Sequence, residues 1–597
     1  MLQISCASLA KAAFALGLLD VVSAVSATSS TTSPKYNCNP SDSCWPSNAE
    51  WETFNSSLSG NLHRTIPFAA SCYYDSTFYD PAACKVVEKN YITNQARTDI
   101  FGAATGLNWE SCHAQTCALN AEDSFSVLSS TCDLGRLSSL YVDAREAQHV
   151  VTAVKFAKAH NLRISIKNTG HDYFGRSTSP NTLAIWTHNM DSLAYHADFT
   201  ASKCPRANGQ HIGEMGAGTQ ALSAYEYFTG YGMDVAGGNE GSVGLAGGFG
   251  QGGGHGVFGP AYGLMVDNAV EFEVVTADGE LKTINECNDP DLFWAMRGGG
   301  GGTFAILTSY RFQLHPAVKI NVYSFTAKFK LHGNATTNYR ALEQVLTQHA
   351  THQPVWSNNN VSGHAYYWPD KMELYLVLPS NNVTALKSLS RGFSSFLTHH
   401  SDIEVGESNY TTYPKYTGFL SLTNSIAAEV TPGGIWEAVA SRLMPRSLFE
   451  TKTSVSNLVK AVIEGMMVSN KLVPDGGSLT QIIMTTPVNH QNGNATSANP
   501  VWRSALWHTL MTGGWTKKLS NSEENELQEA WLGTIEPLKA LTPGGGCYVN
   551  EGSYKEPQWQ DTFYGSNYHE LLQIKEQYDP THFFDCYKCV GWNGPSE

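Results

Sequence analysis

The stretch Lys167-Asn-Thr-Gly-His171-Asp172-Tyr-Phe-Gly175-Arg176-Ser177 closes a predicted β-α-β unit and opens the most unusual part of the chain. Residues 140–142 and 163–167 alternate like strands, and apolar residues recur between them at helical spacing. Asp143 begins an Asp-x-x-Glu pattern that is typical of a helix N-cap and predicts that the helix starts there. His171 therefore follows a strand directly, on a polar turn.

Two glycine-rich loops follow this turn. Residues 237–256 read GGNEGSVGLAGGFGQGGGHG, and residues 297–302 read RGGGGG. Glycine allows the backbone to approach a ligand closely, so the loops indicate a cradle for a large phosphate-bearing ligand, with a low-complexity loop as the alternative. Gly248-x-Gly250-x-x-Gly253 matches the dinucleotide fingerprint formally, but it is not clearly placed between a strand and a helix. Neither loop contains Gly-Lys-Ser/Thr, which disfavours nucleotide hydrolysis.

Composition excludes several classes of protein. The chain has 597 residues, a net charge of −15 and only 15% charged residues, with 11% aromatic residues. This is not the composition of a disordered chain. The acidic balance and the absence of basic runs argue against a nucleic-acid partner.

The N-terminus predicts export. Residues 1–27 have the pattern of a signal peptide. No run of about 18 apolar residues follows them, so no membrane helix is predicted. Twelve cysteines follow Cys6, and we expect disulfides from them, although Cys586-x-x-Cys589 has the spacing of a metal half-site. No bound metal is expected. The glycosylation sequons, which suit a secreted glycoprotein, are Asn55, Asn334, Asn360, Asn382, Asn409 and Asn494.

Several motifs occur in a fixed order: Gly170-His171-Asp172-x-x-Gly-Arg-Ser, the GGGHG loop, Tyr262-Gly-Leu…Asp-Asn268, and Trp294-Ala-Met-Arg followed by five glycines. Together with Tyr548-Val-Asn-Glu551 they resemble the FAD-linked oxidases of the vanillyl-alcohol-oxidase superfamily with the PCMH-type FAD domain. The berberine-bridge-enzyme-like branch, in its fungal secreted form, is the most similar. The resemblance covers about residues 60–597 and is vague across 320–540.

The resemblance implies an α+β fold: a two-domain PCMH-type FAD-binding fold (two α/β subdomains) with a substrate domain built on an antiparallel sheet covered by helices. The composition changes after His315-Pro316, which places a domain boundary there. The expected divisions are a signal peptide (1–27), a cysteine-containing segment (28–132), the FAD-binding domain (133–316), the substrate-binding domain (317–540) and a C-terminal segment that returns to the FAD domain (541–597).

The resemblance also implies that FAD is attached covalently through His171. The residues expected to bind the cofactor are Asn168, Thr169, Gly170, His171, Asp172, Val243, Gly253, Gly254, His255, Gly256, Asn268 and Asn550, with Gly298–Gly302 along its ribityl and adenine side. Many relatives carry a second link from a cysteine, and Glu240 stands at that position here. We therefore expect a single link. Val243 stands where family members carry a residue that gates dioxygen, and valine there resembles the oxidases.

Tyr548 resembles the family tyrosine that faces the substrate. A phenol with a pKa near 10 is a poor base at neutral pH, so a helper is expected, and His508 is one candidate. Arg503 and Trp507 lie in the same region, where Trp507 could equally be a core residue. The pattern does not say which alternate residues of that strand point inward.

The leading hypothesis is a secreted FAD-dependent oxidase. It would transfer hydride from an alcohol, a sugar or a related metabolite to the flavin, with dioxygen as acceptor and hydrogen peroxide as product. One alternative is a biosynthetic enzyme that forms a ring or double bond by oxidation. Another is a secreted binding glycoprotein that has lost redox activity. No nucleic-acid or membrane partner is expected, and the sequence leaves the oligomeric state open.

Overall fold

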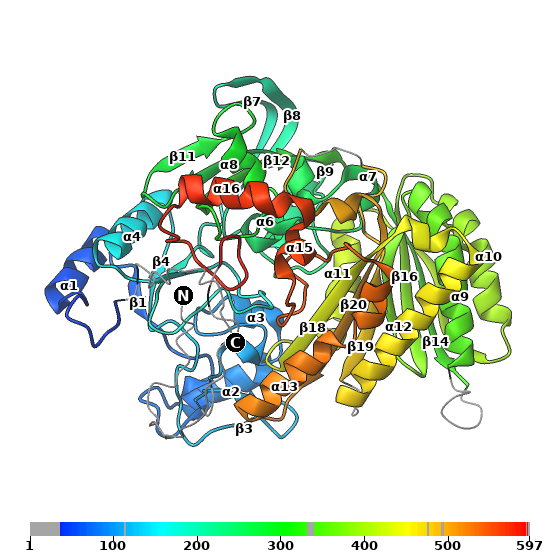
Figure 1. Cartoon of the computed structure of the whole chain (residues 1–597), viewed down its shortest axis with the longest axis horizontal. Coiled ribbons are helices and arrows are strands. Elements are labelled where there is room, and N and C mark those ends of the chain that lie inside the picture. Colours follow the sequence, from blue (N-terminus) through cyan, green and yellow to red (C-terminus); the bar gives the residue numbers. More distant parts are fainter. Residues whose placement is uncertain are drawn as a thin grey trace, which may run out of the picture.

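The computed structural model describes residues 36, 38–112, 115–330, 339–473, 477–490, 495–592 and 594. Figure 1 shows a large sheet with its helices on one side of the molecule and two smaller sheets on the other. The predicted signal peptide and two of the sequons, Asn334 and Asn494, lie outside the described residues.

The first small sheet contains the predicted β-α-β unit. Its strand order is β1-β4-β6-β5, and β6 pairs in parallel with both β4 and β5. Its elements are β1 (Leu62–Arg64), β4 (Leu140–Asp143), α4 (Ala147–Ala159), β5 (Ile164–Lys167) and β6 (Leu183–Trp186). The predicted start of α4 at Asp143 is wrong. The carboxylate of Asp143 instead accepts hydrogen bonds from Arg145 and Asn189, and it ends β4.

The second small sheet is antiparallel, with the order β11-β10-β12-β8-β7. Its strands are β7 (Leu193–Ala201), β8 (Cys204–Gly216), β10 (Ala269–Val275), β11 (Leu281–Ile284) and β12 (Ile306–Gln313). The predicted hairpin at Asp278-Gly279 is confirmed, with Val275 opposite Leu281 and Gly279 at φ +78°. Helix α5 (Ala221–Thr229) leads from this sheet toward the first glycine loop.

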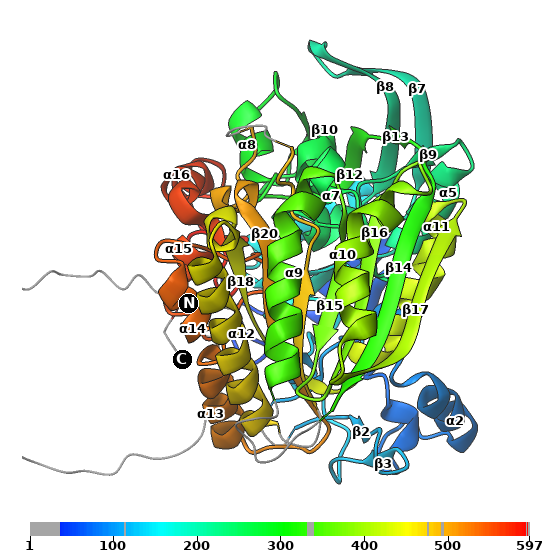
Figure 2. The same ribbon diagram turned by 90° about the vertical axis from the view of Figure 1, so that its right-hand side faces the viewer.

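The large sheet has seven antiparallel strands in the order β17-β14-β16-β15-β19-β20-β18. The strands are β14 (Ile320–Phe329), β15 (Ser362–Tyr367), β16 (Lys371–Pro379), β17 (Ile403–Tyr413), β18 (Trp436–Pro445), β19 (Ser478–Ile483) and β20 (Ala505–Trp515). Figure 2 shows α9 (Arg340–Asn358), α10 (Ala385–His399) and α12 (Lys452–Leu472) across one face of it. The predicted α+β fold class is confirmed.

The chain returns to the smaller sheets at its C-terminal end. Helices α15 (Trp559–Tyr564) and α16 (Tyr568–Tyr578) lie over that half of the molecule in Figure 1, and α16 contacts α8 (Pro290–Ala295). Lys575 on α16 is buried. Its ammonium group donates to the carbonyl oxygens of Thr303 and Phe584 and pairs with Asp579 at 2.7 Å. The helix predicted around residues 571–575 is confirmed.

The remaining named elements complete the fold. They are α1 (Asn48–Ser57), α2 (Pro81–Asn90), α3 (Asn94–Thr98), β2 (Leu119–Asn120), β3 (Ser126–Val127), β9 (Met233–Asp234), α6 (Gly250–Gly252), α7 (Gly259–Tyr262), β13 (His315–Pro316), α11 (Tyr416–Val430), α13 (Asn521–Leu532) and α14 (Glu536–Leu541). None of the described helices combines the length and the apolar character that crossing a bilayer requires.

Disulfides link the chain at several points. Cys586 and Cys589 form one of them, so this pair is not a metal half-site here. Others among the described residues are Cys38–Cys44, Cys72–Cys84, Cys117–Cys132 and Cys204–Cys287. The expectation of disulfides fails at Cys547, which is a free, buried thiol among the described cysteines. Burial raises the pKa of this thiol, which keeps it protonated.

Candidate active site

Two adjoining cavities lie between the sheets. The larger has a volume of about 650 Å³ and the smaller about 300 Å³. Asn168, Asp172, Gly248 and Asn550 line both cavities, so the two cavities adjoin along these residues. The loop after β5 and the first glycine loop therefore supply the shared wall, as ligand sites at the carboxyl ends of parallel strands require.

Lys167, the last residue of β5, fixes the start of the turn through hydrogen bonds of its side chain. Its buried ammonium group donates to the carbonyl oxygens of Ile100, Phe101 and Ala103, and burial lowers its pKa to about 7. Gly170 follows with φ +90°, a conformation that favours glycine. The result is a sharp turn that places residues 168–172 along the cavities.

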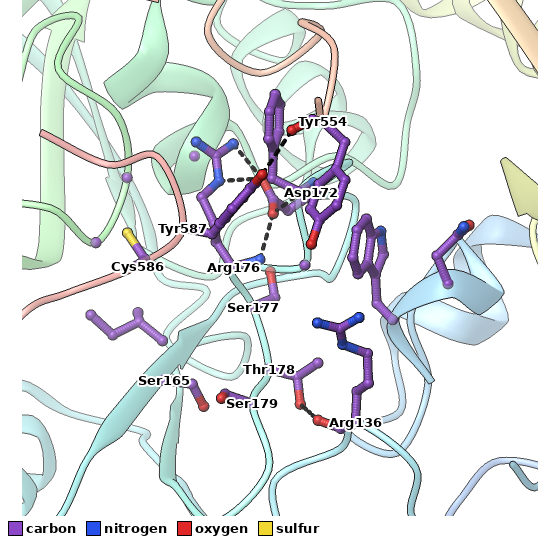
Figure 3. Close-up of a pocket in the computed structure, with 18 of the residues that line it drawn as sticks. Arg136, Ser165, Asp172, Arg176, Ser177, Thr178, Ser179, Tyr554, Cys586 and Tyr587 are labelled. Carbon is purple, nitrogen blue, oxygen red and sulfur yellow. Dashed lines mark hydrogen bonds and ion pairs between the residues drawn. The ribbon is translucent and has the colours of Figure 1, made fainter. Parts of the chain in front are cut away.

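Asp172 shapes the next turn. Its carboxylate accepts hydrogen bonds from the backbone N–H groups of Phe174 at 3.1 Å and Arg176 at 2.7 Å, and from Arg176 Nε at 2.7 Å. Figure 3 shows the two side chains turned toward each other beside Tyr554. The carboxylate of Asp172 thus organises the turn, and the guanidinium of Arg176 stays on the wall of the large cavity.

Several basic side chains line the large cavity, and only Arg176 among them belongs to a sequence motif. Arg136, Arg163, Arg176 and Lys555 all line it. Ser177, Thr178 and Ser179 add hydroxyl groups along the same wall, as Figure 3 shows. Cations and hydroxyl donors of this kind bind a diphosphate. Arg176 and the three hydroxyl residues lie in or directly after the motif of His171, whereas Arg136, Arg163 and Lys555 come from other parts of the chain and no spacing signal marks them.

His171 lines the small cavity and is held by two residues of the first glycine loop. Its Nε2 atom lies 2.8 Å from Ser242 Oγ and 3.5 Å from Glu240 Oε2. The Ser242 hydroxyl donates in turn to Glu240 at 2.8 Å. Burial lowers the pKa of His171, and the nearby Glu240 carboxylate opposes that shift only in part, so the imidazole is neutral near pH 7.

Tyr548 and Asn550 enter from the C-terminal segment. The Tyr548 hydroxyl accepts hydrogen bonds from Gly254 N–H at 3.1 Å and from Asn550 Nδ2 at 2.8 Å. Asn550 Nδ2 also donates to Gly248 O at 3.0 Å. Burial raises the pKa of Tyr548, so the phenol stays protonated. These bonds lock the tyrosine ring between the glycine loop and the small cavity.

Glu551 lies in the small cavity and contacts two histidines. Its carboxylate is 3.3 Å from His255 Nε2 and 3.4 Å from His508 Nδ1. Burial acts to raise the pKa of Glu551, but the charge and hydrogen bond of His255, followed by His508, outweigh it and hold the pKa below its ordinary value. Glu551 is therefore an ionised carboxylate inside the cavity.

His508 was predicted as a candidate base, and the structure places it behind Glu551. It is fully buried, does not line the cavity, and burial lowers its pKa to about 3. Its Nε2 atom is bonded to Ser441 Oγ at 3.0 Å. Its position fits the support of Glu551, because a side chain without access to the cavity does not reach a substrate.

The large sheet closes the small cavity on the side opposite the helices. Leu510 and Thr512 on β20 line the cavity, and His508 has the same parity, so the even-numbered residues point inward. Trp507 points to the other face, where its indole N–H donates to Gln353 on α9. The core alternative for Trp507 is therefore confirmed. Arg503 forms a paired salt bridge with Asp267 at 2.7 Å and is structural.

The remaining predicted cofactor residues divide into two groups. Thr169, Gly170, Val243 and His255 line the small cavity. Four others do not line either cavity: Gly253, Gly254, Gly256 and Asn268. Asn268 instead donates to the carbonyl oxygens of Tyr262 and Leu264 and accepts from His315. A side chain at Gly256 would collide with Gly237 O, so this glycine allows the loop to pack on itself.

Several residues that sequence inspection did not single out belong to the small cavity. Glu437 on β18 lines it, and burial raises the pKa of this carboxyl to about 8. His364 on β15 also lines it, and burial lowers its pKa to about 3. The only signal for Glu551 was its place directly after Tyr548-x-Asn550. Glu437 and His364 lie in ordinary strand patterns, and only the pairing of strands brings them to the site.

The walls of the large cavity fit a dinucleotide such as FAD. Asn168 Oδ1 and Gln251 Oε1 are buried and lack hydrogen-bond partners among the described residues, so they are poised to accept from a ligand. The two glycine loops meet closely there, since a Cβ on Gly301 would lie 2.9 Å from the Cα of Gly248. Gly248 itself faces open space, which leaves room for a flat ring system.

Comparisons with known proteins agree with this geometry. Residues 138–285 match the FAD binding domain family, and residues 547–589 match the berberine and berberine-like family. The chain is 33% identical over 563 residues to the FAD-linked oxidoreductase ZEB1 of Gibberella zeae, covering 93% of this chain and 92% of that protein. It is 30% identical to the VAO-type flavoprotein oxidase VAO615 of Thermothelomyces thermophilus, covering 92% of each.

A solved structure has the same fold along nearly the whole chain. The VAO-type flavoprotein MtVAO713 from Myceliophthora thermophila C1 superposes with a TM-score of 0.82 at 25% identity, over 94% of this chain and 97% of that chain. The glycine cradle, the basic wall and the tyrosine of the C-terminal segment are therefore the candidate site of an FAD-linked oxidoreductase. The chain belongs to the FAD-linked oxidoreductases of the vanillyl-alcohol-oxidase superfamily, in the berberine-bridge-enzyme-like branch.

Proposed function

We propose that this FAD-linked oxidoreductase is a secreted oxidase that removes hydride from a carbon bearing a hydroxyl group in a small molecule. The observation that carries the proposal is that His171, Tyr548 and Glu551 line one cavity, which adjoins the larger cavity suited to the rest of FAD. The bound flavin supplies the two-electron chemistry, and the protein supplies orientation and proton transfer.

Asn168, Gln251 and the backbone of the glycine loops would hold FAD, and His171 would be its point of attachment. Arg136, Arg163 and Lys555 would neutralise the diphosphate charge along the large cavity. Asn550 would hydrogen-bond the flavin edge through Oδ1, since its Nδ2 atom is committed to Tyr548 and Gly248.

Glu551 would accept the hydroxyl proton of the substrate. Glu551 is ionised and lies in the small cavity. His255 and His508 contact its carboxylate and fix the orientation of that group. Tyr548 is held protonated, so it would orient the substrate oxygen by hydrogen bonding rather than act as the base. Glu437, with its pKa raised to about 8, is protonated near pH 7 and would donate a hydrogen bond to a second substrate oxygen.

The lining of the small cavity favours a compact, partly apolar substrate. Tyr366, Tyr375, Phe419, Ile426 and Leu510 supply apolar surface around the carboxyl groups. The volume of about 300 Å³ lies at the lower end of the range for small-molecule sites, and a flavin ring attached to His171 would fill part of it, so the space for a substrate is smaller still. A hydroxylated aromatic or alicyclic metabolite suits this lining better than a long oligosaccharide.

Dioxygen is the proposed electron acceptor. Val243 lines the small cavity together with His171, and it stands at the position where the resemblance implies a dioxygen gate. The pattern of residues 1–27 and the disulfides support secretion. Mass spectrometry of the exported chain is expected to find an N-terminus near residue 28 and glycans at the exposed Asn382 and Asn409.

The test combines cofactor retention with turnover. The purified chain is precipitated with acid, and flavin is expected in the pellet for the wild type and in the supernatant for His171→Ala. Peroxide release is then measured over a panel of hydroxylated aromatic, alicyclic and sugar substrates. Release of all wild-type flavin by acid would refute the linkage. Substrate oxidation without stoichiometric peroxide would refute the oxidase.

The same assay decides the biosynthetic alternative, in which the oxidation forms a ring or a double bond. Product mass spectrometry distinguishes the two outcomes. Oxidation of a hydroxyl creates a new carbonyl that reacts with hydrazine reagents, whereas formation of a ring or of a carbon–carbon double bond creates none. Both products are two hydrogens lighter than the substrate, so the carbonyl test is the deciding one.

A further inference from the structure

We infer that Glu240 and Ser242 are positioning residues that prepare His171 for bonding to the flavin through its Nδ1 atom. The inference rests on the proposed attachment of FAD to His171 and adds the residues that make the attachment occur. Neither residue was among those expected to bind FAD, and the Glu240 side chain stands where a second flavin link would otherwise be made.

The three side chains form a directional chain of hydrogen bonds. The Ser242 hydroxyl lies 3.0 Å from Glu240 Oε1 and 2.8 Å from Oε2, and the Ser242 backbone N–H donates to the same carboxylate at 2.9 Å. A carboxylate only accepts, so the hydroxyl proton of Ser242 points to Glu240. The oxygen lone pair of Ser242 is then left to accept from His171 Nε2 at 2.8 Å.

This direction fixes the tautomer of His171. A donor at Nε2 places the ring proton on that nitrogen, and a neutral imidazole then carries its lone pair on Nδ1. Among the described residues, Nδ1 of His171 makes no hydrogen bond, and the ring lines the small cavity. The nucleophilic nitrogen is therefore the one that is free to meet a ligand.

The electrostatics support the same assignment. Glu240 Oε2 is 3.5 Å from His171 Nε2, and Glu240 is the carboxylate that pairs with this histidine in the described chain. A negative charge at this distance stabilises the positive charge that develops on the imidazole as Nδ1 forms a bond. Glu240 thus helps to form the bond between His171 and the flavin. A cysteine at position 240 would instead provide a second bond to the flavin.

The attachment step balances as follows. A bond forms between His171 Nδ1 and the 8α-methyl carbon of the flavin, one methyl C–H bond breaks, and its proton leaves to solvent. The Nε2 proton passes through Ser242 to Glu240 and then to solvent. The two electrons of the broken C–H bond stay on the flavin ring, and dioxygen with two protons takes them up as hydrogen peroxide.

The experiment measures attachment separately from FAD binding. Glu240→Gln keeps the shape of the side chain and removes its charge, and Ser242→Ala removes the hydroxyl relay. Glu226→Gln on α5 is the matched control, because Glu226 is exposed and carries a charge on the neighbouring helix. Each purified holoprotein is incubated aerobically, and total FAD per chain and the acid-stable fraction are followed over time.

Wild type and Glu226→Gln are expected to reach complete attachment. Glu240→Gln and Ser242→Ala are expected to keep about one FAD per chain and to attach it about 100-fold more slowly, the effect of losing a proton-transfer group. Attachment at the wild-type rate in both variants would overturn the inference. Should Glu240→Gln fail to fold, Ser242→Ala decides. Acid release of flavin from the wild type itself would refute the proposed attachment, and the inference with it.

Discussion

Glu551 is the ionised side chain on which the chemistry of the small cavity depends most. His255 and His508 both contact its carboxylate, and the burial of His508 keeps that partner neutral. His255 holds the pKa of Glu551 below its ordinary value, which keeps the carboxylate ionised, and the neutral His508 orients the second oxygen. The neighbouring Tyr548 is fixed by Gly254 and Asn550 and remains a phenol, so the two side chains have different roles.

Glu551→Gln is expected to lower kcat by roughly 10²- to 10⁴-fold, because the substrate hydroxyl loses its proton acceptor. FAD content is expected to stay at the wild-type value, since Glu551 does not line the large cavity. Steady-state peroxide assays measure the loss. Glu570→Gln on the exposed face of α16 is the matched control, and equal activity in both variants would contradict the assignment.

The pH profile follows from the same carboxylate. A base works only when ionised, so kcat/KM falls as pH drops through the pKa of Glu551. That pKa is held below its ordinary value of 4.5, which places the acid limb below pH 4.5. His255→Asn removes the contribution that opposes burial, and the acid limb is expected to move to higher pH. If the acid limb of kcat/KM does not shift in His255→Asn, Glu551 is not the group that produces it.

At the scale of elements, the glycine loops and α16 shape the cofactor side of the molecule. The first loop turns around Gly248, which faces open space on the wall of both cavities. Helix α16 fixes the second loop, because Lys575 donates to Thr303 O next to the run of glycines. Residues that are remote in sequence thereby define one cradle.

Gly248→Val is expected to abolish retention of FAD while leaving the fold intact. The added side chain meets no protein atom within 4 Å of its Cβ and projects into the space of the cofactor. Flavin absorbance per chain and far-ultraviolet circular dichroism measure the two effects. A variant that keeps a full complement of FAD would show that the flavin does not pass this glycine.

Lys575→Met is expected to cost about 3–5 kcal/mol of unfolding free energy, because it leaves the buried Asp579 carboxylate without its charge partner. Asp579 also accepts from the backbone of Phe583 and Phe584, so the C-terminal segment loosens with it. Denaturant unfolding measures the loss. The exposed Lys460→Met on α12 is the control and is expected to change stability by less than about 0.5 kcal/mol.

For the whole molecule, the proposed cofactor would connect its two halves. The small cavity takes its walls from the parallel-strand turn, the first glycine loop, the large sheet and the C-terminal segment. A ligand bound there contacts all of them at once. Binding therefore contributes to the stability of the complete fold rather than to one domain.

The melting temperature of the wild type is expected not to change with added FAD, because an attached cofactor does not dissociate. The melting temperature of His171→Ala is expected to rise with free FAD, corresponding to about 2.7 kcal/mol at 100 times the dissociation constant. Thermal unfolding at several FAD concentrations measures both. A wild-type melting temperature that rises with the FAD concentration would contradict covalent attachment.

The sequence predicted the strand-helix-strand unit, the Asp278-Gly279 hairpin and the α16 helix, because each is set by local periodicity and turn chemistry. It misplaced the start of α4, where the Asp143 carboxylate bonds to Arg145 and Asn189 instead of capping the helix. It left open which face of β20 points inward. The pairing of β20 with β19 and β18 decides which alternate residues of β20 face the cavity. No local signal in the sequence specifies that pairing.

By itself, the sequence determined the family, the α+β class and the place of the glycine loops, His171 and Tyr548. These depend on ordered motifs and on residue types that few folds use. Only the tertiary structure decided that Glu551 is ionised, that His508 stands behind it, and that Glu240 reaches His171 through Ser242. These properties arise from burial and from contacts between segments far apart in the chain, and burial and contact are what fix the charge of a side chain.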